Sequence, residues 1–377
     1  MTARESTANN SRRKEAFYAI SADESTRIKV WRLWLALLVI FAHASTNTVR
    51  VGGENVAALV IPNWLSFVNY VLTIIIARCT TPAFSLISAV LLFRKPFVWR
   101  TNAARKFKSM MIPLFLLTSF WVALYAVGPY IPGLRALFSS QTSRVVDWTP
   151  RQWFAAYLGW TPEHATPTLL YPLWFLRDLM LMHLIAPAIK WIIDRIPRLF
   201  LCALAVLLVI KTDSDFHFYT IHQIFIFFCL GYYAVKYDLH LSDLDRIPWA
   251  AIAGLYALTI AGGYLARAYF DDISAVRGIP NLVGVLFFAR CTTKIRDGKW
   301  LRMILWLSEY TIAIYLFQER MLGFSKKLLL RVLPASVPTT LVIFYVLPAI
   351  IAALCVLIAW LLRRYQPRFY SLITGTR

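Results

Sequence analysis

The chain has 377 residues, 59% of them hydrophobic, and a mean hydropathy of +0.58, whereas a soluble globular domain has about 45–50% apolar residues. This composition excludes an ordinary soluble fold. The net charge of +21 comes from basic residues grouped between apolar runs, so it indicates cytoplasmic loops of a membrane protein, and no nucleic-acid partner is expected.

The sequence predicts an all-α, polytopic integral membrane protein with about ten transmembrane helices. Residues 1–26 are polar and lack the apolar core of a signal peptide, so we expect a disordered cytoplasmic tail there. The transmembrane domain is expected over 27–365, followed by a short cytoplasmic tail over 366–377. Apolar runs predict spans near 31–48, 64–93, 109–128, 171–189, 199–211, 217–236, 248–266, 278–291, 303–323 and 338–362.

The distribution of basic residues predicts the orientation. An even number of spans puts both termini on one side, together with the loops after the second and eighth spans. These segments are rich in Lys and Arg, which predicts a multi-pass protein of the inner (cytoplasmic) membrane with both termini cytoplasmic. The second span would extend roughly 45 Å as a straight helix, so we expect Pro82 to kink it.

The longest loop on the opposite face covers roughly 129–170 and is rich in Pro and Trp, including Trp148, Trp153 and Trp160. Its length favours a lid or an acceptor-binding element. Anchoring of the aromatic side chains at the membrane interface explains them equally well.

Arg32 and His43 stand out in the first span, because ten uncharged residues separate them. A charge-capable side chain within a membrane is costly, which favours a functional role. Along a helix the two lie roughly 16 Å apart, about half of a bilayer core. His43 suits a general base near neutral pH. The alternatives are a hydrogen-bonded core histidine and, for Arg32, a topological anchor.

Other charged residues interrupt the second, fourth and ninth spans: Arg78, Arg177, Asp178, Glu309, Glu319 and Arg320. Counted from opposite ends of their spans, Asp178 and His43 fall at similar depth, so Asp178 is a candidate to orient His43. An ion pair of Asp178 with Arg177 or Arg78 is the alternative. Gln318 and Glu319 also fall in the outer half.

Other chemistries find no support in the sequence. The five cysteines show no CxxC spacing, and no HExxH, Walker-type, GxGxxG or GxSxG sequence occurs. We therefore expect no metal site and no tightly bound cofactor. His183 stands alone in the fourth span.

The spacing of Arg32 and His43 resembles the first-span marker of the membrane-integral acyltransferase-3 family, whose members transfer acyl groups to cell-surface glycans and other acceptors. The resemblance covers about 28–362. Ser88 fits a family motif in which Ala89 replaces a Gly, and Gln318 stands where a His is common. The segments that carry the further resemblance are 78–89, 105–108 before Ile112-Pro113, Leu-Trp-Phe-Leu at 173–176, and 308–318.

The resemblance implies transfer of an acyl group, expected to be acetyl, from cytoplasmic acyl-CoA to a hydroxyl of an exopolysaccharide or lipid-linked sugar of the cell envelope. Acetyl-CoA would then be a co-substrate, and the bilayer and a glycan acceptor the other partners. His43 would act as base, with an acyl-histidine intermediate as the alternative. A secondary transporter of an acidic solute or lipid-linked glycan remains the alternative function.

These expectations assign roles to the remaining candidates. Arg and Lys side chains clamp phosphates, so the expected donor-binding residues are Arg32, Arg78, Arg105 and Lys106. The expected catalytic residues are His43 and Asp178. The expected pocket residues are Ser88, Trp174, Arg177, Glu309, Tyr315 and Gln318.

Overall fold

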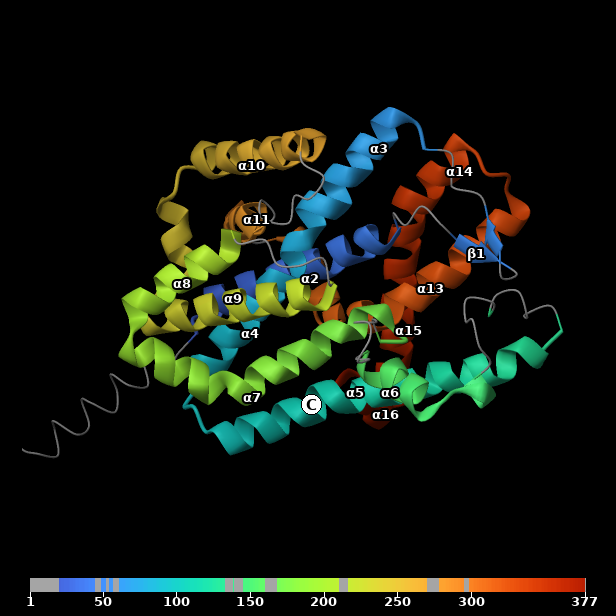
Figure 1. Ribbon diagram of the computed structural model, residues 1–377, viewed down its shortest axis with the longest axis horizontal. Coiled ribbons are helices and arrows are strands. Elements are labelled where there is room, and N and C mark those ends of the chain that lie inside the picture. Colours follow the sequence, from blue (N-terminus) through green and yellow to red (C-terminus); the bar gives the residue numbers. More distant parts are fainter. Residues whose placement is uncertain are drawn as a thin grey trace, which may run out of the picture.

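A bundle of helices surrounds α2, as seen in the computed structural model of the chain (Figure 1). The structure describes residues 20–44, 49–51, 54–56, 61–132, 138, 145–159, 168–209, 216–269, 278–294 and 298–376. The α-helices are α2 (Ala22–Ala44), α3 (Asn63–Tyr70), α4 (Thr80–Phe93), α5 (Trp99–Val127), α6 (Pro150–Leu158), α7 (Trp174–Arg195), α8 (Pro197–Val209), α9 (Phe216–Lys236), α10 (Trp249–Tyr269), α11 (Gly278–Cys291), α12 (Lys299–Ser308), α13 (Thr311–Val332), α14 (Val337–Leu341), α15 (Leu347–Tyr365) and α16 (Pro367–Thr374).

Irregular elements are few within the described ranges. The π-helical segments are η1 (Val71–Ile76) and η10 (Val342–Val346). The 3-10 turns are η2 (Ala77–Cys79), η3 (Gly128–Tyr130), η5 (Val145–Asp147), η6 (Tyr171–Leu173), η7 (Leu241–Arg246) and η9 (Thr292–Lys294). Two short strands, β1 (Val49–Val51) and β2 (Glu54–Val56), pair antiparallel with Val49 opposite Val56.

The prediction of an all-α, polytopic membrane protein is confirmed, apart from this small hairpin. Four helical stretches are long and apolar enough to cross a membrane: Asn63–Phe93, Trp99–Tyr130, Trp249–Ala266 and Val337–Tyr365. Three shorter apolar helices are Pro197–Val209, Ile221–Lys236 and Gly278–Cys291. Each of the ten predicted spans corresponds to helix in the described part of the chain.

The ends of the chain contain more helix than predicted. α2 begins at Ala22, where the Oγ of Ser21 accepts a hydrogen bond from the Glu24 amide, so part of the expected tail is helical. Residues 1–19 lie outside the described residues. The expected C-terminal tail forms α16, which packs on α5. Gly375 follows at φ 64°, and a Cβ there would lie 2.1 Å from the Ser109 carbonyl oxygen.

The second span is broken before Pro82, not at it. α3 passes into η1 and η2 before α4 starts at Thr80. Pro82 therefore lies in the first turn of a new helix, where a missing amide hydrogen costs little. The irregular turns come earlier and include Arg78.

The ninth span is also broken. α12 ends at Ser308, α13 begins at Thr311, and α13 then continues past the predicted end near 323. Its last turns carry Lys326 and Lys327, which are both buried.

Packing places α2 between two hydrophobic cores. Trp31 and Leu35 belong to the larger core, formed mainly by α4, α5, α7 and α9. Leu33 and Ile40 belong to a second core with α13 and α15. Both sides of α2 are thus held by packing, so the side chains it carries have fixed positions.

Loops predicted to share one side of the membrane do meet. Arg27 on α2 donates two hydrogen bonds of 3.0 Å to the Asp245 carboxylate and one of 3.0 Å to the Thr292 hydroxyl. Arg94 after α4 pairs with Asp238 at 2.7 Å. These contacts join the first helix to the loops after the second, sixth and eighth spans. We call this the basic end of the bundle.

Candidate active site

Arg32 and His43 are half-buried on α2, separated by roughly 16 Å along the helix axis. The His43 imidazole contacts the Tyr171 ring edge-to-face, with ring centroids 5.4 Å apart. The backbone carbonyl oxygen of His43 accepts a hydrogen bond of 2.9 Å from the Nζ of Lys326 on α13. Helix α2 and the turn before α7 thus meet α13 at His43.

Further charges gather around this histidine. Tyr171 lies close enough to Arg78 and Glu319 to interact with them electrostatically, and Glu319 does the same with Lys326. We call these five residues, His43 included, the His43 cluster. The sequence predicted its histidine and Arg78 but missed Lys326, which lies beyond the predicted end of the ninth span.

A second group of charges lies around Arg32. Lys106 on α5 interacts electrostatically with Arg32, Lys95 and Arg105. These four residues form the cationic cluster. The cationic cluster contains three of the four residues predicted to bind the donor. Arg78, the fourth, lies with the His43 cluster. Arg78 precedes α4 and is about 22 Å from the other, basic end of α4.

A buried Ser–His pair lies beside the cationic cluster. The Ser88 Oγ on α4 is 3.3 Å from the Nε2 of His183 on α7. His183 is only 2% exposed, interacts electrostatically with Lys106, and its Nδ1 has no hydrogen-bond partner among the described residues. The sequence left His183 isolated because nothing in its own span signals Ser88, 95 positions away.

Asp178 pairs with its neighbour. Its Oδ1 accepts a hydrogen bond of 2.7 Å from the Nε of Arg177, and both side chains are buried. Arg177 also donates to the carbonyl oxygen of Leu158, the last residue of α6. This is the alternative that the sequence left open: the described contact of Asp178 is with Arg177, so orientation of His43 by Asp178 stays an untested prediction.

The expected pocket residues divide into buried and exposed ones. Trp174 and Tyr315 are buried, and the Tyr315 hydroxyl donates to the carbonyl oxygen of Pro172. Gln318 is 0% exposed, and its amide atoms have no hydrogen-bond partner among the described residues. Glu309, in contrast, is exposed.

Glu309 lies where the ninth span breaks, between α12 and α13. Its side chain is 52% exposed and pairs with Arg363 on α15. The break turns Glu309 out of the bundle and away from the buried candidates, so its assignment to the pocket stays a prediction.

Comparisons with known proteins agree with the predicted family. A family model described as an acyltransferase domain, that of the acyltransferase-3 family, matches residues 26–364. The chain is similar to the succinoglycan biosynthesis protein ExoH of Rhizobium meliloti (strain 1021), with 27% identity over 301 residues and 74% of each chain covered. No solved structure matches.

Proposed function

This chain belongs to the acyltransferase-3 family and is a membrane acyltransferase, and we propose that it moves an acetyl group from cytoplasmic acetyl-CoA to a hydroxyl of a polysaccharide or lipid-linked sugar. One observation carries this proposal: a single helix joins the cationic cluster at Arg32 to the His43 cluster. The similarity to a protein named for succinoglycan biosynthesis supports a polysaccharide acceptor.

The donor binds at the cationic cluster. CoA carries several phosphates, which Arg32, Arg105 and Lys106 would hold by charge-assisted hydrogen bonds. The basic loops at this end support its assignment to the cytoplasmic side of the inner membrane, with both termini there.

The pantetheine arm extends inward from the cationic cluster. Ser88 and His183 lie next, linked electrostatically to the cluster through Lys106. Their polar atoms would hydrogen-bond the amides of the arm. The thioester then approaches His43, because the long arm spans the roughly 16 Å between the two ends of the site.

Transfer takes place at His43. Its imidazole accepts the proton of the acceptor hydroxyl while that oxygen attacks the thioester carbonyl. The tetrahedral intermediate then expels the CoA thiolate, which takes up the proton. Base catalysis of this kind contributes about 10²–10⁴-fold, and the cationic side chains of Lys326 and Arg78 stabilise the developing oxyanion.

Asp178 and Arg177 act through position rather than chemistry. Their buried pair ties the end of α6 to the start of α7. Tyr171, which contacts the His43 ring, lies in the turn directly before α7. The pair therefore holds the ring that orients His43.

Turnover of the purified protein tests the proposal. The protein in nanodiscs receives acetyl-CoA with candidate glycans, and both CoA release and acetylated glycan are measured. His43→Ala and Arg32→Ala should lose activity, while His222→Ala, a histidine change on α9 outside both clusters, should retain it. Full transfer by His43→Ala would overturn the proposal. Uptake of a solute into proteoliposomes by the wild type, without any acetyl transfer, would also overturn it.

A further inference from the structure

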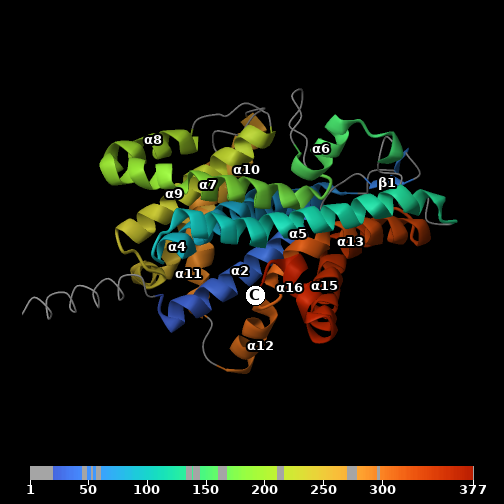
Figure 2. The ribbon, with the colours of Figure 1, turned by 90° about the horizontal axis from the view of Figure 1, so that it is seen from below.

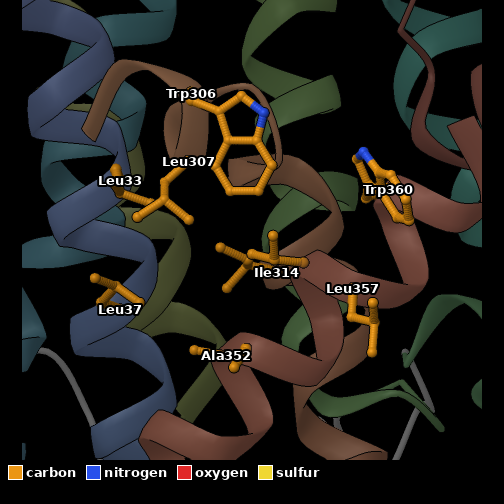
Figure 3. A pocket seen from close by; sticks show the side chains of 10 residues that line it. Leu33, Leu37, Trp306, Leu307, Ile314, Ala352, Leu357 and Trp360 are labelled. Carbon is orange, nitrogen blue, oxygen red and sulfur yellow. The ribbon is translucent and has the colours of Figure 1, made fainter. Parts of the chain in front are cut away.

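An apolar groove opens on the side of the bundle between α2, α12, α13 and α15 (Figure 3). Its volume is about 500 Å³, and ten residues, all apolar, line it. Pockets for small molecules typically measure about 300–1,000 Å³. The groove offers no polar partner, so it suits a hydrocarbon chain and not a sugar or a nucleotide. Residues that define it are Leu33, Leu37, Trp306, Ile314, Leu357 and Trp360.

Cations lie at one end of this groove. On a helix, residues four apart share a face, and three of the lining helices carry an exposed cation at that spacing from a lining residue. These are Lys29 before Leu33 on α2, Arg302 before Trp306 on α12, and Arg364 after Trp360 on α15. Lys29 lies on the N-terminal side of the lining residues of α2, and Arg364 lies on the C-terminal side of those of α15. These two helix ends are both at the basic end of the bundle.

The local charge balance at this end is positive. Arg363, one turn beyond Trp360, pairs with Glu309 at the junction of α12 and α13. Arg363, Lys29, Arg302 and Arg364 form the rim of the groove together with Glu309. These five residues include four basic side chains and one acidic side chain. The rim is therefore complementary to an anionic group.

Aromatic side chains place the groove mouth at a membrane interface. Trp306 and Trp360 are 47% and 42% exposed, and Trp side chains favour the boundary between hydrocarbon and head groups. None of the residues of α12 is buried, and the helix projects from the bundle (Figure 2). A short helix with exposed Trp and basic residues is typical of an interfacial segment.

We propose that this groove binds an anionic phospholipid from the leaflet at the basic end. One hydrocarbon chain fills the apolar groove, and the phosphate contacts Lys29, Arg302 and Arg364. Basic sites between transmembrane helices are suited to anionic lipid head groups. A lipid-linked acceptor fits less well, because His43 lies roughly 9 Å beyond Leu37, away from the basic end.

Lipid binding would brace the donor end of the site. Leu33 lines the groove, and its neighbour Arg32 belongs to the cationic cluster. A lipid that binds only the folded state raises stability in proportion to the logarithm of its concentration. Lipid binding of this kind does not depend on acyl transfer.

Binding in nanodiscs of defined composition tests the inference. Wild-type protein is compared in phosphatidylcholine alone and with added phosphatidylglycerol, by native mass spectrometry and thermal unfolding. We expect retained phosphatidylglycerol and a higher melting temperature. The double variant Arg302→Gln/Arg364→Gln should weaken lipid retention roughly 30-fold, from about 1 kcal/mol for each cation near an anionic lipid surface.

Two further variants separate the groove from general charge. Arg195→Gln/Arg198→Gln removes the same charge from exposed positions at α7 and α8 and should leave retention unchanged. Ala353→Trp adds bulk inside the groove at an exposed position and should abolish retention without unfolding the bundle. An equal loss in the Arg195/Arg198 control, unaffected binding in Ala353→Trp, or equal retention of phosphatidylcholine would each overturn the inference.

Discussion

The Nζ of Lys326 lies 2.9 Å from the carbonyl oxygen of His43 and donates a hydrogen bond to it. Carbonyl groups in the last turn of a helix have no partner within that helix, and His43 is the penultimate residue of α2. Lys326 thus caps α2 from α13 and adds a cation beside the proposed base.

Replacement of Lys326 by Met should slow acyl transfer by roughly 10²-fold, as expected for the loss of one group that stabilises an oxyanion. The Michaelis constant for acetyl-CoA should change little, because the donor phosphates bind at the other end of α2. Initial rates with labelled acetyl-CoA measure both quantities. The matched control is Lys327→Met, which removes a neighbouring buried lysine outside the His43 cluster. Equal losses in the two variants would argue against a specific role for Lys326.

His43 should act as a base without carrying the acyl group. Rapid acid quenching of wild-type protein with labelled acetyl-CoA should therefore leave no label on the His43 peptide. His43→Ala should lose about 10²–10⁴-fold in rate, the usual contribution of a positioned base. Label on His43 that forms and decays at the rate of turnover would instead indicate an acyl-histidine intermediate.

Ser88→Ala and His183→Gln should weaken binding of the pantetheine arm. Each lost hydrogen bond is worth about 0.5–1.5 kcal/mol, so affinity for acetyl-CoA should fall roughly 2–10-fold. Binding of 3′-phosphoadenosine 5′-diphosphate, which has the phosphates of CoA without the arm, should be unchanged in both variants and weakened in Arg32→Gln. Calorimetric titration of the detergent-solubilised protein measures these affinities. Unchanged binding of acetyl-CoA in both pair variants would remove Ser88 and His183 from the donor path.

Asp178→Ala should destabilise the fold, because it leaves the buried Arg177 guanidinium without the carboxylate that neutralises it. The loss of one partner from a buried pair costs about 3–5 kcal/mol, which thermal unfolding in detergent detects. The double change Arg177→Met/Asp178→Leu should recover much of the lost stability, since no buried charge remains. If Asp178→Asn abolishes activity while its melting temperature stays at the wild-type value, Asp178 has a direct chemical role that the pair alone does not explain.

The sequence predicted those features that are local in the chain. Hydropathy along each segment marked the spans, and spacing within one helix related Arg32 to His43. Contacts between helices could not be predicted from the sequence. Ser88 and His183 meet because α4 and α7 both pack against α9. The break that exposes Glu309 gave no signal in the sequence, because residues 309–310 include neither Gly nor Pro. Lys326 was missed because two adjacent lysines ended the apolar run, although α13 continues past them.

The π-helical segments make the number of residues in a helical turn important for the site. Both η1 and η10 contact α2, and a π turn holds one residue more than an α turn. Deletion of one residue within 71–76 would restore a regular α-helix and leave the hydropathy of the span almost unchanged. It would also remove the wider turn that contacts α2. The geometry around His43 is therefore encoded partly by residue register, a property that substitutions alone do not probe.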